Sequence, residues 1–212
     1  MKNISDALRL YAVTDRGWLR GKTLFEQVEE AIQGGATMIQ LREKELSCDE
    51  FLTEAIEMKK LCHMYGVPLI INDNVDIAIS VRADGVHVGQ SDMAAMDVRR
   101  LIGKDMILGV TAKTVSQALL AESSGADYLG SGAVFGSSTK NDAKFMTKEL
   151  LSDICKSVKI PVVAIGGINR LNILELKGSG IKGAAIVSGI FAASDIKTEC
   201  EELKKLLNEV VR

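Results

Sequence analysis

Two aspartates, each following a short apolar run, stand out as candidates for binding a metal ion. Asp73 comes just after residues 68–71, and Asp92 comes a few polar residues after residues 85–88. Apolar runs this short, bounded by turn residues, are typical of strands buried on both faces. Residues 75–80 can form a short crossover helix, so we expect neighbouring parallel strands whose carboxylates leave the same sheet edge. Two carboxylates there favour a hard divalent cation such as Mg²⁺.

Similar polar residues follow the other apolar runs of the chain. If all the strands end at one face, three cations, two aspartates and two glycine-containing turns converge there. Arg and Lys suit phosphate oxygens, glycine N–H groups cradle phosphate, and carboxylates hold Mg²⁺. The set therefore predicts a diphosphate site with a divalent metal. Its members are Arg42, Glu43, Lys44, Asn72, Asp73, Gln90, Asp92, Thr111, Lys140, Gly166, Gly167, Ser188 and Gly189.

Each of these residues also has a purely structural explanation. Asp73 and Asp92 are residue types that commonly cap the helix that follows them. The charged run 42–44 is compatible with a solvated loop. His87 lies inside an apolar run and is expected in the core, whereas His63 is expected on a helix surface.

Eight short strands that alternate with helical segments must position these side chains. Thr23 and Glu26 have the spacing of a capping box at a helix start, and residues 49–65 carry apolar residues at helical spacing. Eight such units in 212 residues predict one (β/α)₈ barrel, a single TIM-barrel domain over residues 1–212, with a doubly wound open sheet as the alternative. The strands are expected at 8–14, 38–41, 68–71, 85–88, 107–110, 128–132, 162–165 and 184–187. The later helices are expected at 93–102, 114–124, 147–158, 169–177 and 197–210.

Composition narrows the possible binding partners of the protein and its expected location in the cell. The net charge is −2 and no long basic run is present, which argues against nucleic acid or an anionic membrane as a partner. No signal-like segment or membrane-length apolar run is seen, and the four cysteines are scattered. We therefore expect a cytoplasmic protein with reduced thiols that binds small molecules. The sequence leaves the oligomeric state open, a homo-oligomer included.

Several motifs, taken in order along nearly the whole chain, resemble thiamine phosphate synthases. They are residues 40–44 (QLREK), 71–73 (IND), 85–92 (GVHVGQSD), 109–111 (GVT), 127–132 (DYLGSG), 138–140 (STK), 164–168 (AIGGI) and 186–188 (IVS). Single motifs of this set are weak, but QLREK, the Asn-Asp pair, GQSD and the Lys140 loop in succession are specific. Thr111 and Ser137 depart from the family's usual Ser and Thr, and Ala133 stands where Pro is common.

The resemblance implies a transferase that joins hydroxymethylpyrimidine diphosphate to a thiazole phosphate and releases pyrophosphate. It implies that Asp73 and Asp92 bind Mg²⁺, and that a carbocation-like path needs no protein nucleophile. The implied catalytic residues are Arg42, Lys44, Asn72, Thr111 and Lys140. Substrate binding is implied for these five and for Gln40, Leu41, Glu43, Ser137, Ser138, Thr139, Gly167, Val187 and Ser188.

Two other functions fit parts of the pattern. A related barrel family of thiazole tautomerases is expected to use a His base just after the fifth strand, where this chain has Thr111-Ala112-Lys113. A non-catalytic phosphometabolite sensor is expected to lose the carboxylate pair or Lys140, and this chain keeps both. The synthase is therefore the favoured function.

Overall fold

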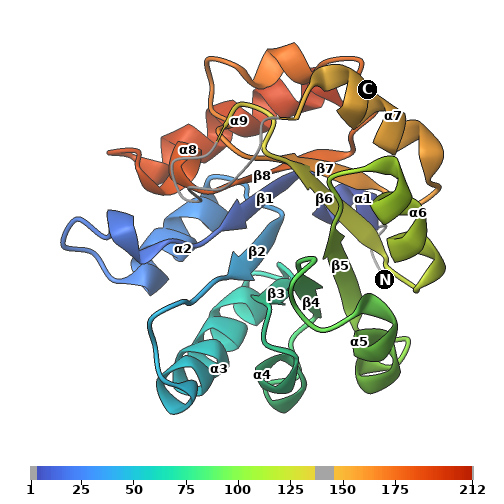
Figure 1. Cartoon of the computed structure of the whole chain (residues 1–212). Coiled ribbons are helices and arrows are strands. Elements are labelled where there is room, and N and C mark those ends of the chain that lie inside the picture. Colours follow the sequence, from blue (N-terminus) through green and yellow to red (C-terminus); the bar gives the residue numbers. More distant parts are fainter. Residues whose placement is uncertain (1–3, 137–145, 212) are drawn as a thin grey trace.

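Eight parallel strands form a closed barrel in the computed structural model, which describes residues 4–136 and 146–211 (Figure 1). Each strand pairs with the next along the chain, and Leu10 lies opposite Ala184 where the first strand meets the last. The predicted barrel is therefore confirmed, and the open sheet is wrong. The strands are β1 (Leu10–Val13), β2 (Met38–Leu41), β3 (Leu69–Asn72), β4 (Gly85–Val88), β5 (Ile107–Thr111), β6 (Tyr128–Gly132), β7 (Val162–Ile165) and β8 (Gly183–Ile186).

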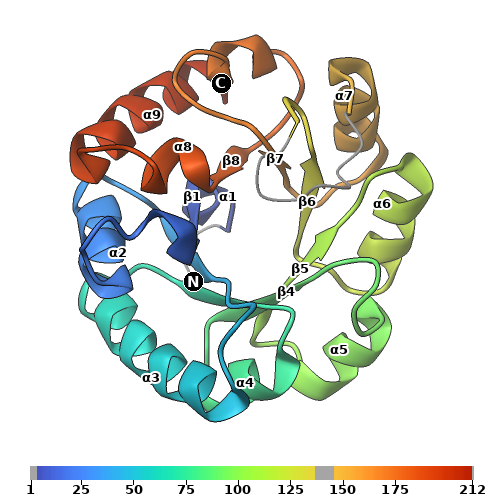
Figure 2. The ribbon, with the colours of Figure 1, turned by 60° about the vertical axis from the view of Figure 1, so that its left-hand side comes forward.

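The helices form a ring around this barrel (Figure 2). Those that connect or follow the strands are α2 (Leu24–Gln33), α3 (Cys48–Met64), α4 (Val75–Ser80), α5 (Ala95–Ile102), α6 (Val115–Ser123), α7 (Lys148–Ser157), α8 (Ser188–Phe191) and α9 (Ile196–Val210). A short α1 (Ile4–Ala7) precedes β1, and single 3₁₀ turns occur at η1 (Arg16–Trp18) and η2 (Ile173–Leu176). No helix of the described residues is both long and apolar enough to cross a membrane.

Side-chain hydrogen bonds decide where several helices begin. The predicted capping box of Thr23 and Glu26 is present at α2, and Ser47 and Glu50 form a second one at α3. The helix expected at 169–177 is wrong, because only the turn η2 forms there. Asn172 accepts from the Asn169 backbone N–H and donates to the Gly167 carbonyl. Such side-chain bonds compete with helical backbone bonds.

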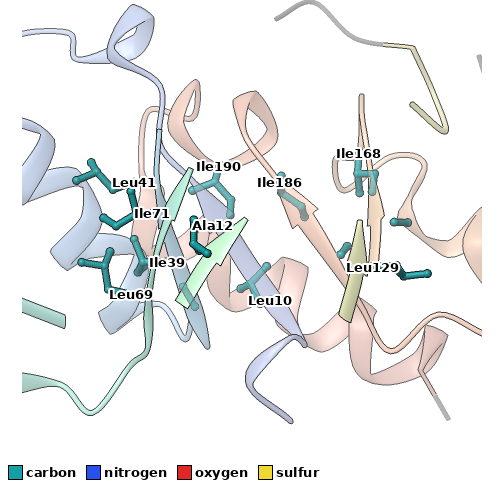
Figure 3. Close-up of a cluster of buried hydrophobic side chains, with 14 of the residues drawn as sticks. Leu10, Ala12, Ile39, Leu41, Leu69, Ile71, Leu129, Ile168, Ile186 and Ile190 are labelled. Carbon is teal, nitrogen blue, oxygen red and sulfur yellow. The ribbon is translucent and has the colours of Figure 1, made fainter. Parts of the chain in front are cut away.

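The alternation of side chains along each strand divides the core into two layers. One layer fills the barrel itself and includes Tyr11, Val13, Met38 and Tyr128. The other lies between the barrel and the helices (Figure 3) and includes Leu10, Ala12, Ile39, Leu41, Leu69 and Ile71. Leu41 thus packs toward the helices, whereas Gln40 beside it faces the barrel axis.

Candidate functional site

A cavity of about 450 Å³ opens at the C-terminal ends of the strands. Residues on or just past all eight strands line it, which is the usual position of the active site in this fold. Of the predicted site residues, twelve reach this cavity. They are Gln40, Arg42, Lys44, Asn72, Asp73, Gln90, Asp92, Thr111, Gly166, Gly167, Val187 and Ser188.

Asp73 stands at the end of β3 and does not cap the following helix. Asn74 is the cap of α4 and accepts a hydrogen bond from the Ile77 N–H at 2.9 Å. Asp73 has a φ of 63°, which is uncommon for a residue other than glycine. Its carboxylate accepts a hydrogen bond from Lys44 Nζ at 2.7 Å. The capping explanation is therefore wrong for Asp73, whose carboxylate faces the cavity.

Asp92 does not cap a helix either. Helix α5 begins after Ala94 without a side-chain cap, and Asp92 accepts from the Gly89 N–H at 2.7 Å. Burial raises the pKa of Asp92, and hydrogen bonding with Asp73 raises it further, against the opposing effect of Gly89. Burial acts on Asp73 too, but hydrogen bonds from Lys44 and others hold the pKa of its carboxyl below the usual value. The two carboxyl groups thus meet at the cavity.

This pair has the composition of a magnesium site. In the part of the chain that the structure describes, no third carboxylate, His or Cys joins the two aspartates to form a larger cluster. Mg²⁺ is usually held by one or two protein carboxylates, with water and substrate phosphates completing its shell. Asp73 and Asp92 therefore fit Mg²⁺ better than a metal that needs an all-protein shell.

The loop after β2 contributes the positive charges. Arg42 and Lys44 both line the cavity, and the Arg42 backbone N–H donates to Thr14 Oγ1 at 2.9 Å. Lys113, just past β5, also lines the cavity. We did not predict Lys113 as a site residue, although its position after a strand end was a usable signal.

Glu43 lies between Arg42 and Lys44 in the sequence but does not line the cavity. Its carboxylate accepts from Arg16 Nε at 2.8 Å, and Arg16 also pairs with Glu54 on α3. Burial raises the pKa of Glu43 to about 7, and the Glu54 charge adds to this, although the hydrogen bond from Arg16 acts in the opposite direction. Leu41, Glu43 and Gly189 are thus the three described residues of the predicted set that the structure does not bring to the cavity.

This raised pKa predicts a pH dependence of stability. A folded-state pKa of about 7, above the ordinary value of 4.5, means that the folded chain binds the proton more tightly than the unfolded chain. Its contribution to the free energy of unfolding is complete below about pH 4.5 and is lost as the pH rises through about 7. We expect Glu43→Gln to flatten the pH profile in this window, as measured by urea unfolding. A profile that keeps its wild-type slope would assign the dependence to another group.

Two glycines occupy the end of β7, where the fold often binds phosphate. Gly166 and Gly167 have φ values of 103° and 68°. A Cβ at Gly167 would lie 2.6 Å from the Phe135 carbonyl oxygen. Val187 and Ser188 line the cavity at the end of β8, the strand that pairs with β7. The remaining predicted residues, Ser137, Ser138, Thr139 and Lys140, lie outside the described residues.

Sequence reasoning missed the polar floor of the cavity. Tyr11 and His87 line it, and both are also buried, as was expected for His87. The Tyr11 and Tyr128 hydroxyls lie 2.8 Å apart, and Tyr128 OH lies 3.0 Å from His87 Nδ1. The available signal was a set of three polar-tipped side chains at inward positions of otherwise apolar strands.

Comparison with known proteins agrees with this geometry. A family model described as thiamine monophosphate synthase matches residues 10–190. The chain belongs to the thiamine monophosphate synthase family. It is accordingly a transferase of thiamine biosynthesis, as the motifs predicted.

Other members of the thiamine monophosphate synthase family match over nearly their whole length. The thiamine-phosphate synthase of Ruminiclostridium cellulolyticum is 53% identical over 93% of this chain and 94% of its own. That of Clostridium tetani is 50% identical over 94% and 96%. The solved structure of thiamine phosphate pyrophosphorylase from Pyrococcus furiosus is 40% identical, with a TM-score of 0.91, over 99% of this chain and all of that one.

Proposed function

We propose that the chain makes thiamine phosphate by joining hydroxymethylpyrimidine diphosphate to thiazole phosphate, with Mg²⁺ held by Asp73 and Asp92. The observation that carries this proposal is the pairing of the two carboxylates beside Lys44 at the end of a closed barrel. Acidic groups for a cation and basic groups for phosphate oxygens are then available on one rim.

The arrangement suits the loss of pyrophosphate. The bond between the methylene carbon and the diphosphate oxygen breaks, and the electron pair leaves with pyrophosphate. Arg42 and Lys44 offset the negative charge that grows on the leaving group. Bound Mg²⁺ would supply further neutralisation of that charge.

The second half of the reaction forms the new bond. The aminopyrimidine stabilises a positive methylene carbon, and the thiazole nitrogen donates its electron pair to that carbon. Gly167, Val187 and Ser188 are proposed to hold the thiazole phosphate, whereas Gln40, Asn72 and Thr111 hold the pyrimidine diphosphate. The protein needs to supply no nucleophile.

The function is tested by incubating the purified chain with both substrates and Mg²⁺. We expect thiamine phosphate and pyrophosphate in equal amounts, and a large loss of rate when the metal is chelated, because the leaving-group charge is then less well neutralised. Liquid chromatography of the product and a coupled pyrophosphate assay measure the two. A related synthase assayed in parallel is the control. Absence of thiamine phosphate while the control enzyme works would reject the proposal.

A further inference from the structure

A chain of hydrogen bonds crosses the barrel below the cavity and joins Gln40 to Thr111. Gln40 Nε2 donates to the Tyr11 hydroxyl at 2.6 Å, and the Tyr11 and Tyr128 hydroxyls lie 2.8 Å apart. Tyr128 OH lies 3.0 Å from His87 Nδ1, and His87 Nε2 lies 3.0 Å from Thr111 Oγ1. The five side chains come from β2, β1, β6, β4 and β5. The two end members of the hydrogen-bond chain, Gln40 and Thr111, line the cavity.

The backbone leaves space for this chain at one position. Gly109 on β5 lies between His87 on β4 and Tyr128 on β6 in the strand register. A Cβ at Gly109 would lie 2.2 Å from Tyr128 Cζ and 2.5 Å from His87 Nδ1. Only glycine at this position lets the two rings meet across the strand.

The two tyrosines are neutral links. Tyr11 is 1% exposed and Tyr128 is fully buried. Burial raises the pKa of both hydroxyls well above the ordinary value, so each keeps its proton. A neutral phenol has one proton to donate, so each link in the chain determines the next.

The protons can be placed by requiring that every buried donor has an acceptor. Because Tyr11 accepts from the Gln40 amide, its own proton goes to Tyr128. The Tyr128 proton then goes to His87 Nδ1. With Nδ1 as acceptor, neutral His87 carries its proton on Nε2 and donates to Thr111 Oγ1. With the Gln40 amide turned as it is in the structure, the opposite order would leave the Tyr11 proton in the core without an acceptor, which is unfavourable.

From this order of donors and acceptors, which runs from Gln40 to Thr111, we infer that the chain of hydrogen bonds selects the chemical class of the first substrate. It keeps Gln40 Oε1 as an acceptor at the cavity, where an exocyclic amino group is the complement. It also leaves the Thr111 proton to be donated to a ligand, which suits a diphosphate oxygen. A diphosphate whose ring carries an oxo group in place of the amino group sets acceptor against acceptor at Gln40. This specificity rests on the proposed function.

The direction itself can be measured without substrate. The chain has two histidines, so exposed His63→Gln leaves His87 as the single imidazole. We expect nitrogen-15 NMR of the substrate-free His63→Gln protein to show His87 neutral, with Nε2 protonated and Nδ1 bare. A proton on Nδ1, alone or together with one on Nε2, would overturn the inference.

The selectivity is measured as binding, because the amino group also promotes pyrophosphate loss. Calorimetry with Mg²⁺ and no thiazole phosphate would compare the amino diphosphate with its oxo analogue. We expect wild type to prefer the amino compound at least ~100-fold. Tyr128→Phe removes the donor to His87 and frees the amide of Gln40 to turn, so its preference should fall at least ~10-fold.

A matched control is Tyr65→Phe, which removes a hydroxyl hydrogen bond to Glu29 on the outside of the barrel. It should keep the wild-type preference. Equal binding of the two diphosphates by wild type, or an unchanged preference in Tyr128→Phe, would overturn the selectivity. A protein that shows the expected His87 tautomer and preference but forms no thiamine phosphate would instead contradict the proposed function alone.

Discussion

Replacing Asp73 or Asp92 by asparagine will lower turnover by at least ~100-fold. Each change removes one of the two negative charges that we propose for Mg²⁺, and the neutral amide is a weaker ligand for a hard cation. Asparagine also tolerates the positive φ of Asp73, so the substitution should leave the backbone conformation unchanged. Steady-state rates at saturating substrates and several Mg²⁺ concentrations measure the effect.

A matched control is Asp97→Asn, which removes a carboxylate from an exposed ion pair with Arg100 on α5. Its turnover should equal that of wild type. Thermal unfolding followed by circular dichroism should show a cooperative transition for all three variants, as expected for folded proteins. Near-normal turnover in both Asp73→Asn and Asp92→Asn would remove the metal assignment while leaving the barrel and its family unaffected.

The largest expected loss of stability follows from Gly183→Ala. A Cβ at Gly183 would lie 1.8 Å from the Leu8 carbonyl oxygen and 2.6 Å from its carbonyl carbon. These are backbone atoms, so they cannot move aside without shifting the chain that leads into β1. We expect the free energy of unfolding to fall by more than ~3 kcal/mol, or the chain not to fold. Urea unfolding of the purified protein measures this.

Gly17→Ala serves as the comparison. Its added Cβ would approach only Asp15 Oδ1, at 3.1 Å, which belongs to a side chain that can move. We expect a small change in its unfolding free energy. If Gly183→Ala proved as stable as Gly17→Ala, the close packing where β1 meets β8 would have to be looser than the structure shows.

The sequence was most informative where burial and polarity change together. Short apolar runs followed at once by polar residues predicted all eight strands, and the same change marked Asp73, Asp92, Lys44 and Thr111 as cavity residues. The physical reason is that parallel strands buried on both faces need a continuous apolar sequence. The polar residues that follow these strands then meet at one end of the barrel.

The sequence was less informative where side-chain direction decides the role. Glu43 lies between Arg42 and Lys44 in the sequence, and both of these line the cavity. The Glu43 carboxylate instead pairs with Arg16, outside the cavity lining. Tyr11 and Tyr128 lie inside apolar runs, so periodicity alone gave no reason to connect their hydroxyls. Both features depend on residues far apart in sequence, which only the closed barrel brings together.

The closure of the barrel also bears on how the protein is made. Because Leu10 pairs with Ala184, one side of the earliest strand stays unsatisfied until almost all of the described chain has been translated. A nascent polypeptide emerging from the ribosome therefore exposes bare strand edges for most of its synthesis. Joining the first and last strands brings together residues far apart in sequence, so we expect it to be a slow step of folding.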